Sequence, residues 1–146
     1  MHTLARVISQ IESSNNPKAL RFEPTVYSGL KANHLIMDAE NSIMSIHDCT
    51  RETAEIIYST SFGLYQIMGF NIWGDLNYTR TLFDYVADET AQYNMFCEFL
   101  KQKQIAFHLS DLLTNKLNLD RFAILYNGSL SYADAIISTA RMMGLS

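Results

Sequence analysis

The chain is poor in cysteine, and its few cysteines form no recognisable framework. Only Cys49 and Cys97 occur among 146 residues, and the sequence does not show whether they approach each other. Two buried free thiols are therefore expected. His34, His47 and His108 do not combine with these cysteines at the spacing of a zinc site, so we expect no metal and no cofactor.

The chain also lacks an excess of basic residues and any long hydrophobic run. Eleven lysines and arginines stand against 15 acidic residues, which gives a net charge of −4 and argues against nucleic-acid binding. No window is long enough to span a membrane, and polar residues interrupt the Leu4–Ile11 segment, so that no signal peptide fits. We expect a soluble protein that is made in the cytoplasm and does not insert into membranes.

Two kinds of catalytic signature are missing as well. The sequence contains no glycine-rich nucleotide-binding loop, and nothing specifies a histidine and aspartate beside a serine or cysteine nucleophile. What is present is apolar and aromatic: 48% of the residues are hydrophobic, with eight Phe and eight Tyr. At this length they suffice for a core without disulfides or metal, and with no repeats or linkers we predict one domain over 1–146.

The first segment has the period of an amphipathic helix. Its apolar residues recur at i, i+3, i+4 and i+7, and they are Leu4, Val7, Ile8 and Ile11. Glu12 follows Ile8 by four residues, so it projects from the same face at the C-terminal end. The polar run Ser13–Pro17 then ends the helix.

The next segments mix extended and helical signals. Phe22-Glu23 precedes Pro24 and is expected to be extended, and Pro24 suits the first turn of a helix through Leu30. Between Leu35 and His47, two apolar runs flank a polar Asp38–Asn41 stretch, which predicts a β-hairpin. Thr50 is expected to cap a helix that reaches about Tyr58.

The remainder of the sequence indicates helices. Leu64–Phe70 is short and apolar, as in a buried central helix. Two amphipathic segments between 82 and 100 are separated near Asp88, and further helices are predicted at about 108–116, 119–126 and 131–143. The predicted fold is α+β, mostly helical, with a small β-lobe near residues 20–48.

Three short motifs occur in a recognisable order along the chain. They are Glu12-Ser13, the run from Ser61 to Asn71 that contains Gly-Leu-Tyr-Gln, and Tyr126-Asn127-Gly128, with Phe22-Glu23 between the first two. From about residue 4 to 140 the chain resembles the bacteriophage N-acetylmuramidase (endolysin) family of the lysozyme-like superfamily, related to goose-type lysozymes and lytic transglycosylases. The resemblance implies a lysozyme-like two-lobed fold with a small β-hairpin lobe and a substrate cleft between the lobes.

Glu12 is the predicted general acid. Cleavage of a glycosidic bond needs a carboxylic acid that is still protonated near neutral pH. The apolar stripe and the negative end of the helix dipole both raise the pKa of a carboxyl at this position. The alternative is an exposed glutamate at a frayed helix end, but the resemblance implies that the catalytic acid is Glu12.

The identity of a second carboxylate stays open in the sequence. The resemblance points to Glu23, as a base that activates water or as a nucleophile. Glu23 would otherwise only neutralise the amino end of the following helix. Asp38 and Glu40 are rivals, because goose-type enzymes draw their second acid from the presumed hairpin lobe.

The other motif residues are predicted to bind substrate. Gly63 allows a tight turn or a close approach to a sugar ring, and Gln66 offers a donor and an acceptor for hydroxyl or N-acetyl groups. Ser61 would orient the acid or cap a helix that begins at Gly63. The resemblance brings the Tyr126 hydroxyl near the acid and gives Asn127 a sugar contact; alternatively, both merely end a helix.

These observations predict a peptidoglycan hydrolase that cleaves the β-1,4 bond between N-acetylmuramic acid and N-acetylglucosamine. The alternatives are a lytic transglycosylase that forms 1,6-anhydro ends and a non-catalytic wall-binding virion module. The expected partner is the peptidoglycan glycan strand, bound by a monomer. The enzyme would be made in the host cytoplasm and reach the wall after release, through a separate pore-forming protein, or as part of the virion.

Overall fold

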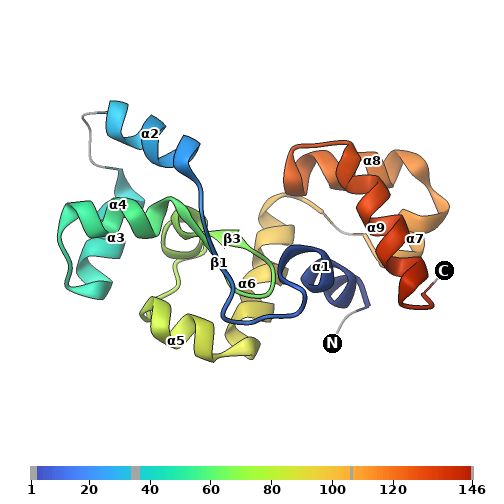
Figure 1. Ribbon diagram of the computed structural model, residues 1–146, viewed down its shortest axis with the longest axis horizontal. Coiled ribbons are helices and arrows are strands. Elements are labelled where there is room, and N and C mark those ends of the chain that lie inside the picture. Colours follow the sequence, from blue (N-terminus) through green and yellow to red (C-terminus); the bar gives the residue numbers. More distant parts are fainter. Residues whose placement is uncertain (1–2, 34–36, 106, 146) are drawn as a thin grey trace.

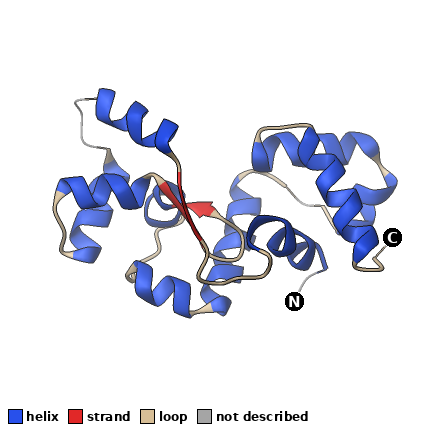
Figure 2. Ribbon diagram, in the orientation of Figure 1, coloured by secondary structure: helices blue, strands red, loops and turns tan. Residues whose placement is uncertain are grey.

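A computed structural model describes residues 3–33, 37–105 and 107–145. Two groups of helices lie on either side of a small sheet, and the long helix α6 passes through the middle of the molecule (Figure 1). Helices account for most of the chain, with short strands at the junction (Figure 2). The elements are α1 Thr3–Ser13, β1 Leu20–Phe22, α2 Pro24–Ala32, α3 Asp38–His47, α4 Arg51–Tyr58, β2 Thr60–Phe62, β3 Ile67–Met68, η1 Asn71–Asp75, α5 Leu82–Ala87, α6 Glu89–Gln102, α7 Leu109–Thr114, α8 Lys116–Asn127 and α9 Ser131–Met142.

The sheet is antiparallel in the order β1-β2-β3. Arg21 of β1 is paired with Ser61 of β2, and Ser61 is also paired with Met68 of β3. A four-residue turn, 63–66, joins β2 to β3 and forms a hairpin with them. The mostly helical α+β class is confirmed, and so is the prediction of extended backbone before Pro24, which begins α2.

Helix α1 confirms its predicted stripe. Leu4, Val7 and Ile8 are at most 1% exposed, and the helix packs against α9 at the other end of the chain. Burial of each such side chain contributes roughly 1.5–3 kcal/mol. The helix that carries Glu12 is therefore anchored in the core, and its last turn has a fixed position.

The predicted hairpin at Leu35–His47 is wrong. Residues 34–36 lie outside the described part of the chain, and from Asp38 to His47 the backbone is the helix α3. Glu40 accepts a hydrogen bond from the backbone N–H of Met37 at 2.7 Å, which satisfies a donor at the helix start. Buried residues Glu40 and Ile43 are three apart, which is a helical spacing. The sheet is formed instead by residues 20–22, 60–62 and 67–68.

The predicted central helix Leu64–Phe70 is also wrong. Residues 63–66 form a turn because Gly63 and Gln66 both have positive φ, 76° and 48°, which reverses the chain. Ile67 and Met68 then continue as β3, and the helical segment starts only afterwards. Ser61 is consequently a strand residue and caps no helix at Gly63.

Helices α4 to α9 agree with the sequence prediction. Thr50 caps α4 by accepting a hydrogen bond from the Thr53 N–H. Asp88 separates α5 from α6 and caps the latter through the Ala91 N–H at 2.9 Å. Helices α7, α8 and α9 match the three predicted C-terminal segments, and Gly128 ends α8 in a left-handed conformation.

Two smaller predictions concern the cysteines and membrane-spanning segments. Cys49 and Cys97 are both free, but neither is buried: Cys49 is only partly covered and Cys97 is exposed. Within the described residues, no helix has both the length and the apolar character needed to cross a membrane.

Candidate active site

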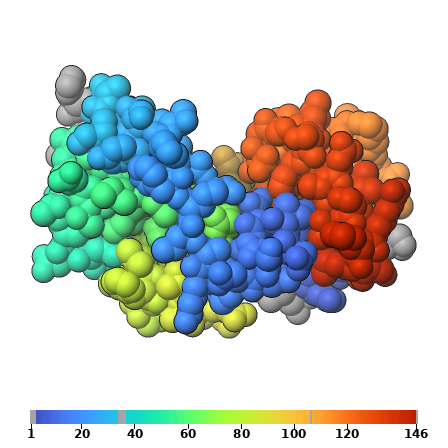
Figure 3. All heavy atoms as spheres, viewed as in Figure 1, coloured from blue at the N-terminus to red at the C-terminus, as the bar shows by residue number. Residues whose placement is uncertain are grey.

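A cleft of about 300 Å³ lies between the two groups of helices. Figure 3 shows the surface hollowed between the α2 region and the C-terminal helices. Its walls come from the end of α1, strand β1, hairpin residues 65–68, the end of α6 and the end of α8. Its polar and charged lining includes Glu12, Arg21, Gln66, Lys103, Tyr126 and Asn127.

Glu12 lies in this cleft and is partly buried. Desolvation raises the pKa of its carboxyl, while a hydrogen bond from Tyr132 and the positive charge of Arg21 act in the opposite direction and only reduce the rise. The Tyr132 hydroxyl donates to Glu12 Oε1 at 2.6 Å. The carboxyl is therefore oriented by a neutral group and retains its proton to a higher pH than an exposed glutamate.

Ser13 connects the helix end that carries the acid to the hairpin turn. Its Oγ lies 3.0 Å from the Leu64 carbonyl and 3.1 Å from the Ser9 carbonyl, so its single hydrogen is shared between two acceptors. The backbone N–H of Gly63 donates to the Ala19 carbonyl at 2.8 Å. Glu12 is thus fixed relative to the cleft wall by contacts of its sequence neighbour.

Gly63 shapes the turn rather than the cleft surface, since it is not among the residues that line the cleft. A Cβ at this position would lie 2.3 Å from Oε1 of Gln92. Gln92, from α6, is fully buried, and its Oε1 accepts from the Leu64 N–H at 2.7 Å. Gly63 is required both for its positive φ and for this close approach.

Gln66 lines the cleft, but its amide is already used by the hairpin. Oε1 accepts a hydrogen bond from Ser61 Oγ at 2.8 Å, and Nε2 donates to the carbonyls of Gly63 (3.0 Å) and Ala19 (3.2 Å). Gln66 is only 9% exposed. Ser61 itself is fully buried and contacts Gln66 and the Arg21 carbonyl. These two residues hold strand β1 beside the turn.

Tyr126 also lines the cleft, at the end of α8, and Asn127 is exposed beside it. The Tyr126 hydroxyl donates to the Tyr65 carbonyl at 2.9 Å. Its ring is stacked between Phe122 (5.4 Å) and Tyr132 (5.8 Å). Tyr126 therefore supports the tyrosine that contacts Glu12.

Sequence reasoning missed Tyr132. Motif order pointed to Tyr126, which lines the same cleft as Glu12, but the hydrogen bond to Glu12 comes from Tyr132 in the first turn of α9. The sequence does indicate that Tyr132 is buried, because it belongs with Ile136 and Ala140 to a stripe of apolar residues four apart. That pattern indicates a buried face but does not specify which side chain lies opposite the tyrosine, 120 residues earlier in the chain.

The candidates for a second carboxylate do not line the cleft. Glu23 forms an ion pair with Arg21, Nε to Oε1 at 2.6 Å, and does not use its side chain to cap α2. Glu40 is fully buried 3.4 Å from Arg51, and Asp38 is an exposed residue in the first turn of α3. Among the described residues that line the cleft, Glu12 is the only acid.

The sequence profile of the N-acetylmuramidase family matches residues 7–136. The chain belongs to the N-acetylmuramidase family. A relative, the endolysin of Enterobacteria phage PRD1, is 34% identical over 99% of this chain and 98% of its own length. No solved structure matches the chain. Family membership makes this protein a glycoside hydrolase that acts on peptidoglycan.

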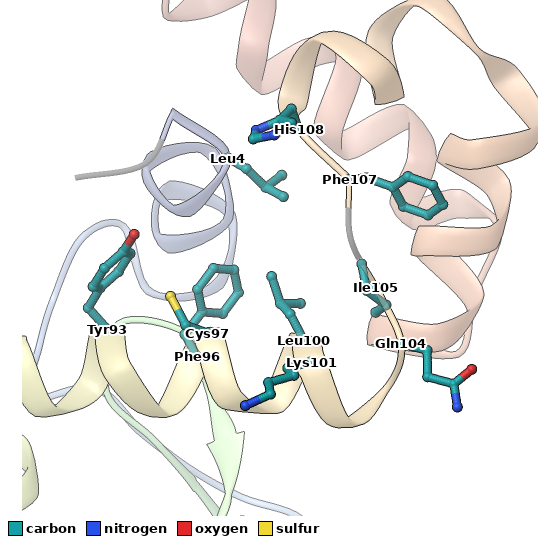
Figure 4. Close-up of a pocket in the computed structure, with 10 residues that line it drawn as sticks. All are labelled: Leu4, Tyr93, Phe96, Cys97, Leu100, Lys101, Gln104, Ile105, Phe107 and His108. Atoms are coloured by element: carbon teal, nitrogen blue, oxygen red, sulfur yellow. The ribbon is translucent and has the colours of Figure 1, made fainter.

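This N-acetylmuramidase has a second, larger cavity of about 570 Å³ between α1 and α6. Figure 4 shows Leu4 opposite Phe96 and Leu100, with Phe107 on the far side. Its described lining contains no carboxylate, so it offers no acid for glycoside cleavage. No group of three His, Cys, Asp or Glu residues in the described part of the chain is arranged to hold a metal ion.

Proposed function

We propose that this family member cleaves the β-1,4 bond between N-acetylmuramic acid and N-acetylglucosamine with Glu12 as the general acid. The observation that carries the proposal is a poorly solvated carboxyl in the cleft, with a raised pKa and an orienting hydrogen bond from Tyr132. A general acid must hold its proton near the working pH and lie where the glycosidic oxygen is bound.

The reaction begins when Glu12 protonates the glycosidic oxygen as the bond to the muramic acid carbon breaks. The departing proton leaves Glu12 ionised in a poorly hydrated site. Tyr132, already donating at 2.6 Å, and the positive charge of Arg21 then stabilise the carboxylate. Water attacks the sugar carbon and forms the new reducing end, and the proton that it gives up passes through solvent to the Glu12 carboxylate, which restores the acid.

Glu23 acts through Arg21 in this proposal. Its carboxylate binds the Arg21 Nε at 2.6 Å and holds the guanidinium at the cleft, near enough for its charge to lower the pKa of Glu12. Glu23 is thereby a positioning residue, in place of the base or nucleophile that the sequence suggested. Gln66 and Ser61 keep the wall in place, and Asn127, exposed at the rim, contacts sugar.

The substrate lies in the cell wall, which the chain reaches after release from the cell in which it is made. The full-length similarity to a phage endolysin supports this role. Release depends on a separate pore-forming protein, and the enzyme acts as a monomer on glycan strands.

Product analysis tests the proposal. Purified peptidoglycan is digested, and the mass of the soluble fragments is measured for the wild type, Glu12→Gln and the control Glu98→Gln. Glu98 is an exposed α6 carboxylate that forms an ion pair with Lys101. We expect reducing muramic acid ends from the wild type and the control, and none from Glu12→Gln. Fragments lighter by one water would indicate 1,6-anhydro ends and replace hydrolysis by transglycosylation. If Glu12→Gln releases soluble fragments as fully as the wild type does, Glu12 is not the general acid.

A further inference from the structure

Two cations line the cleft that contains the acid. They are Arg21 from β1 and Lys103 from the end of α6. This is unexpected in a chain whose net charge is −4. Arg21 is paired with Glu23 just outside the lining, whereas Lys103 adds a positive charge that attracts an anionic group of the substrate.

Lys103 is held in place without being neutralised. Its Nζ lies 5.5 Å from the centroid of the Phe99 ring, which is only 8% exposed and belongs to the same cleft. No carboxylate of the described residues pairs with it. Lys101, two residues earlier, instead contacts Glu98 at 3.4 Å and lines the apolar cavity. The two lysines therefore differ in charge compensation and in the space that they face.

Arg21 retains hydrogen-bonding capacity toward the cleft. A guanidinium has five N–H donors, and among contacts with the described residues only Nε–H is used, by Glu23. Its backbone is fixed by pairing with Ser61 and by the Ser61 Oγ contact to its carbonyl at 3.3 Å. The terminal N–H groups have the fork geometry that binds a carboxylate with two parallel hydrogen bonds.

We propose that Lys103 and Arg21 form a subsite for the carboxylate on the side arm of muramic acid. This inference rests on the proposed function, and it adds how the cleft distinguishes the two sugars. The sugars of the strand alternate, and only muramic acid bears a lactyl group, whose carboxyl is either free or joined to a peptide with carboxylates of its own. N-acetylglucosamine is neutral. Binding the acidic arm sets the register of the strand, so that one of the two kinds of linkage lies at Glu12.

A binding experiment tests the subsite without turnover. The Glu12→Gln protein is titrated calorimetrically with a tetrasaccharide of alternating sugars whose lactyl carboxyls are free, and with the same compound after conversion to neutral methylamides. We expect the acid form to bind about three- to tenfold more tightly, the range for partly exposed charge pairs made by two cations. Adding Lys103→Gln should remove most of this preference, whereas adding the matched Lys101→Gln should leave it unchanged.

A third ligand distinguishes the two sources of the carboxylate. It is the tetrasaccharide with peptides amide-linked to its lactyl groups. A preference for the peptide form that depends on Lys103 assigns the subsite to peptide carboxylates, and a preference for the free lactyl form assigns it to the lactyl group. Equal affinity for the charged and neutral forms overturns the proposal, as does an equal effect of both lysine substitutions or no binding of any ligand. Because Glu12 is already replaced, these outcomes are independent of the product analysis.

Discussion

Carboxylates are buried in two regions of this molecule, and their surroundings differ. Where α2, α3 and α4 meet, Glu40 and Glu55 are 0% and 3% exposed. Arg51 lies 3.4 Å from Glu40 and 3.1 Å from Glu55, and Lys31 lies 2.9 Å from Glu55. In the cleft, Glu12 is less deeply buried, yet the group bonded to it is a neutral tyrosine.

The comparison separates burial that supports packing from burial that supports chemistry. The cations at Glu40 and Glu55 offset the cost of removing charge from water, so this cluster joins three helices. No cation among the described residues is bonded to Glu12, and desolvation therefore favours its protonated form. The exposed fraction alone would therefore rank Glu12 below Glu40 and Glu55 as a candidate acid.

The largest expected effect is on turnover, and it distinguishes Glu12 from the buried carboxylates of the other region. Glu12→Gln should lower kcat on peptidoglycan by about 10³-fold, the contribution of a positioned general acid. Glu55→Gln should leave kcat within about twofold but lower the free energy of unfolding by about 2 kcal/mol, because Lys31 and Arg51 lose a partner yet reach solvent. Turnover and urea unfolding measure the two quantities. Loss of activity in both variants at full stability would contradict the distinction.

Glu12→Gln also has a distinct signature in how stability depends on pH. A raised pKa means that folded Glu12 holds its proton more tightly than the unfolded chain does. Its contribution to stability is therefore greatest below pH 4.5 and declines as the pH rises through the raised pKa. Glu12→Gln should be at least as stable as the wild type near neutral pH and lose that advantage in acid.

A smaller effect tests the backbone that supports the cleft. Gly63→Ala should cost about 2–4 kcal/mol of unfolding free energy, because the added Cβ meets Gln92 Oε1 at 2.3 Å and φ is positive. Gly128→Ala has a similar φ but open space, and should cost only about 1 kcal/mol. Gly29→Ala, in α2 of the other region, should be neutral or stabilising by up to about 1 kcal/mol. Chemical denaturation measures all three, and equal costs at Gly63 and Gly128 would exclude the role of Gln92.

Local patterns in the sequence predicted local structure well. The stripe in α1, the Thr50 cap and the separation at Asp88 are effects of neighbouring residues, and all three are confirmed. The helix α3 was missed because apolar residues at both ends of a polar stretch suit a hairpin as well as a helix. A tight turn at Gly63 was expected, but a helix was predicted after it in place of β3, because the shape of the hairpin depends on Gln92, which lies 29 residues away.

The candidate site shows the same division. Glu12 was predictable, since helix periodicity alone brings it to the apolar face, and its pKa is raised by burial as expected. Tyr132 and Lys103 were not, because they reach the cleft from α9 and α6 through tertiary packing. The sequence predicted a catalytic role for Glu23. It did not show the ion pair between Arg21 and Glu23, because that contact depends on the extended conformation of β1.

The central claim is that Glu12 keeps its proton to a higher pH than an ordinary glutamate, and an NMR titration of its side-chain carboxyl carbon measures this directly. We expect a pKa above the usual 4.5, because burial outweighs the Tyr132 hydrogen bond and the Arg21 charge. In Tyr132→Phe the pKa should rise further, since the lost hydrogen bond favoured the carboxylate. A wild-type pKa at or below 4.5, or one that Tyr132→Phe leaves unmoved, would contradict the account.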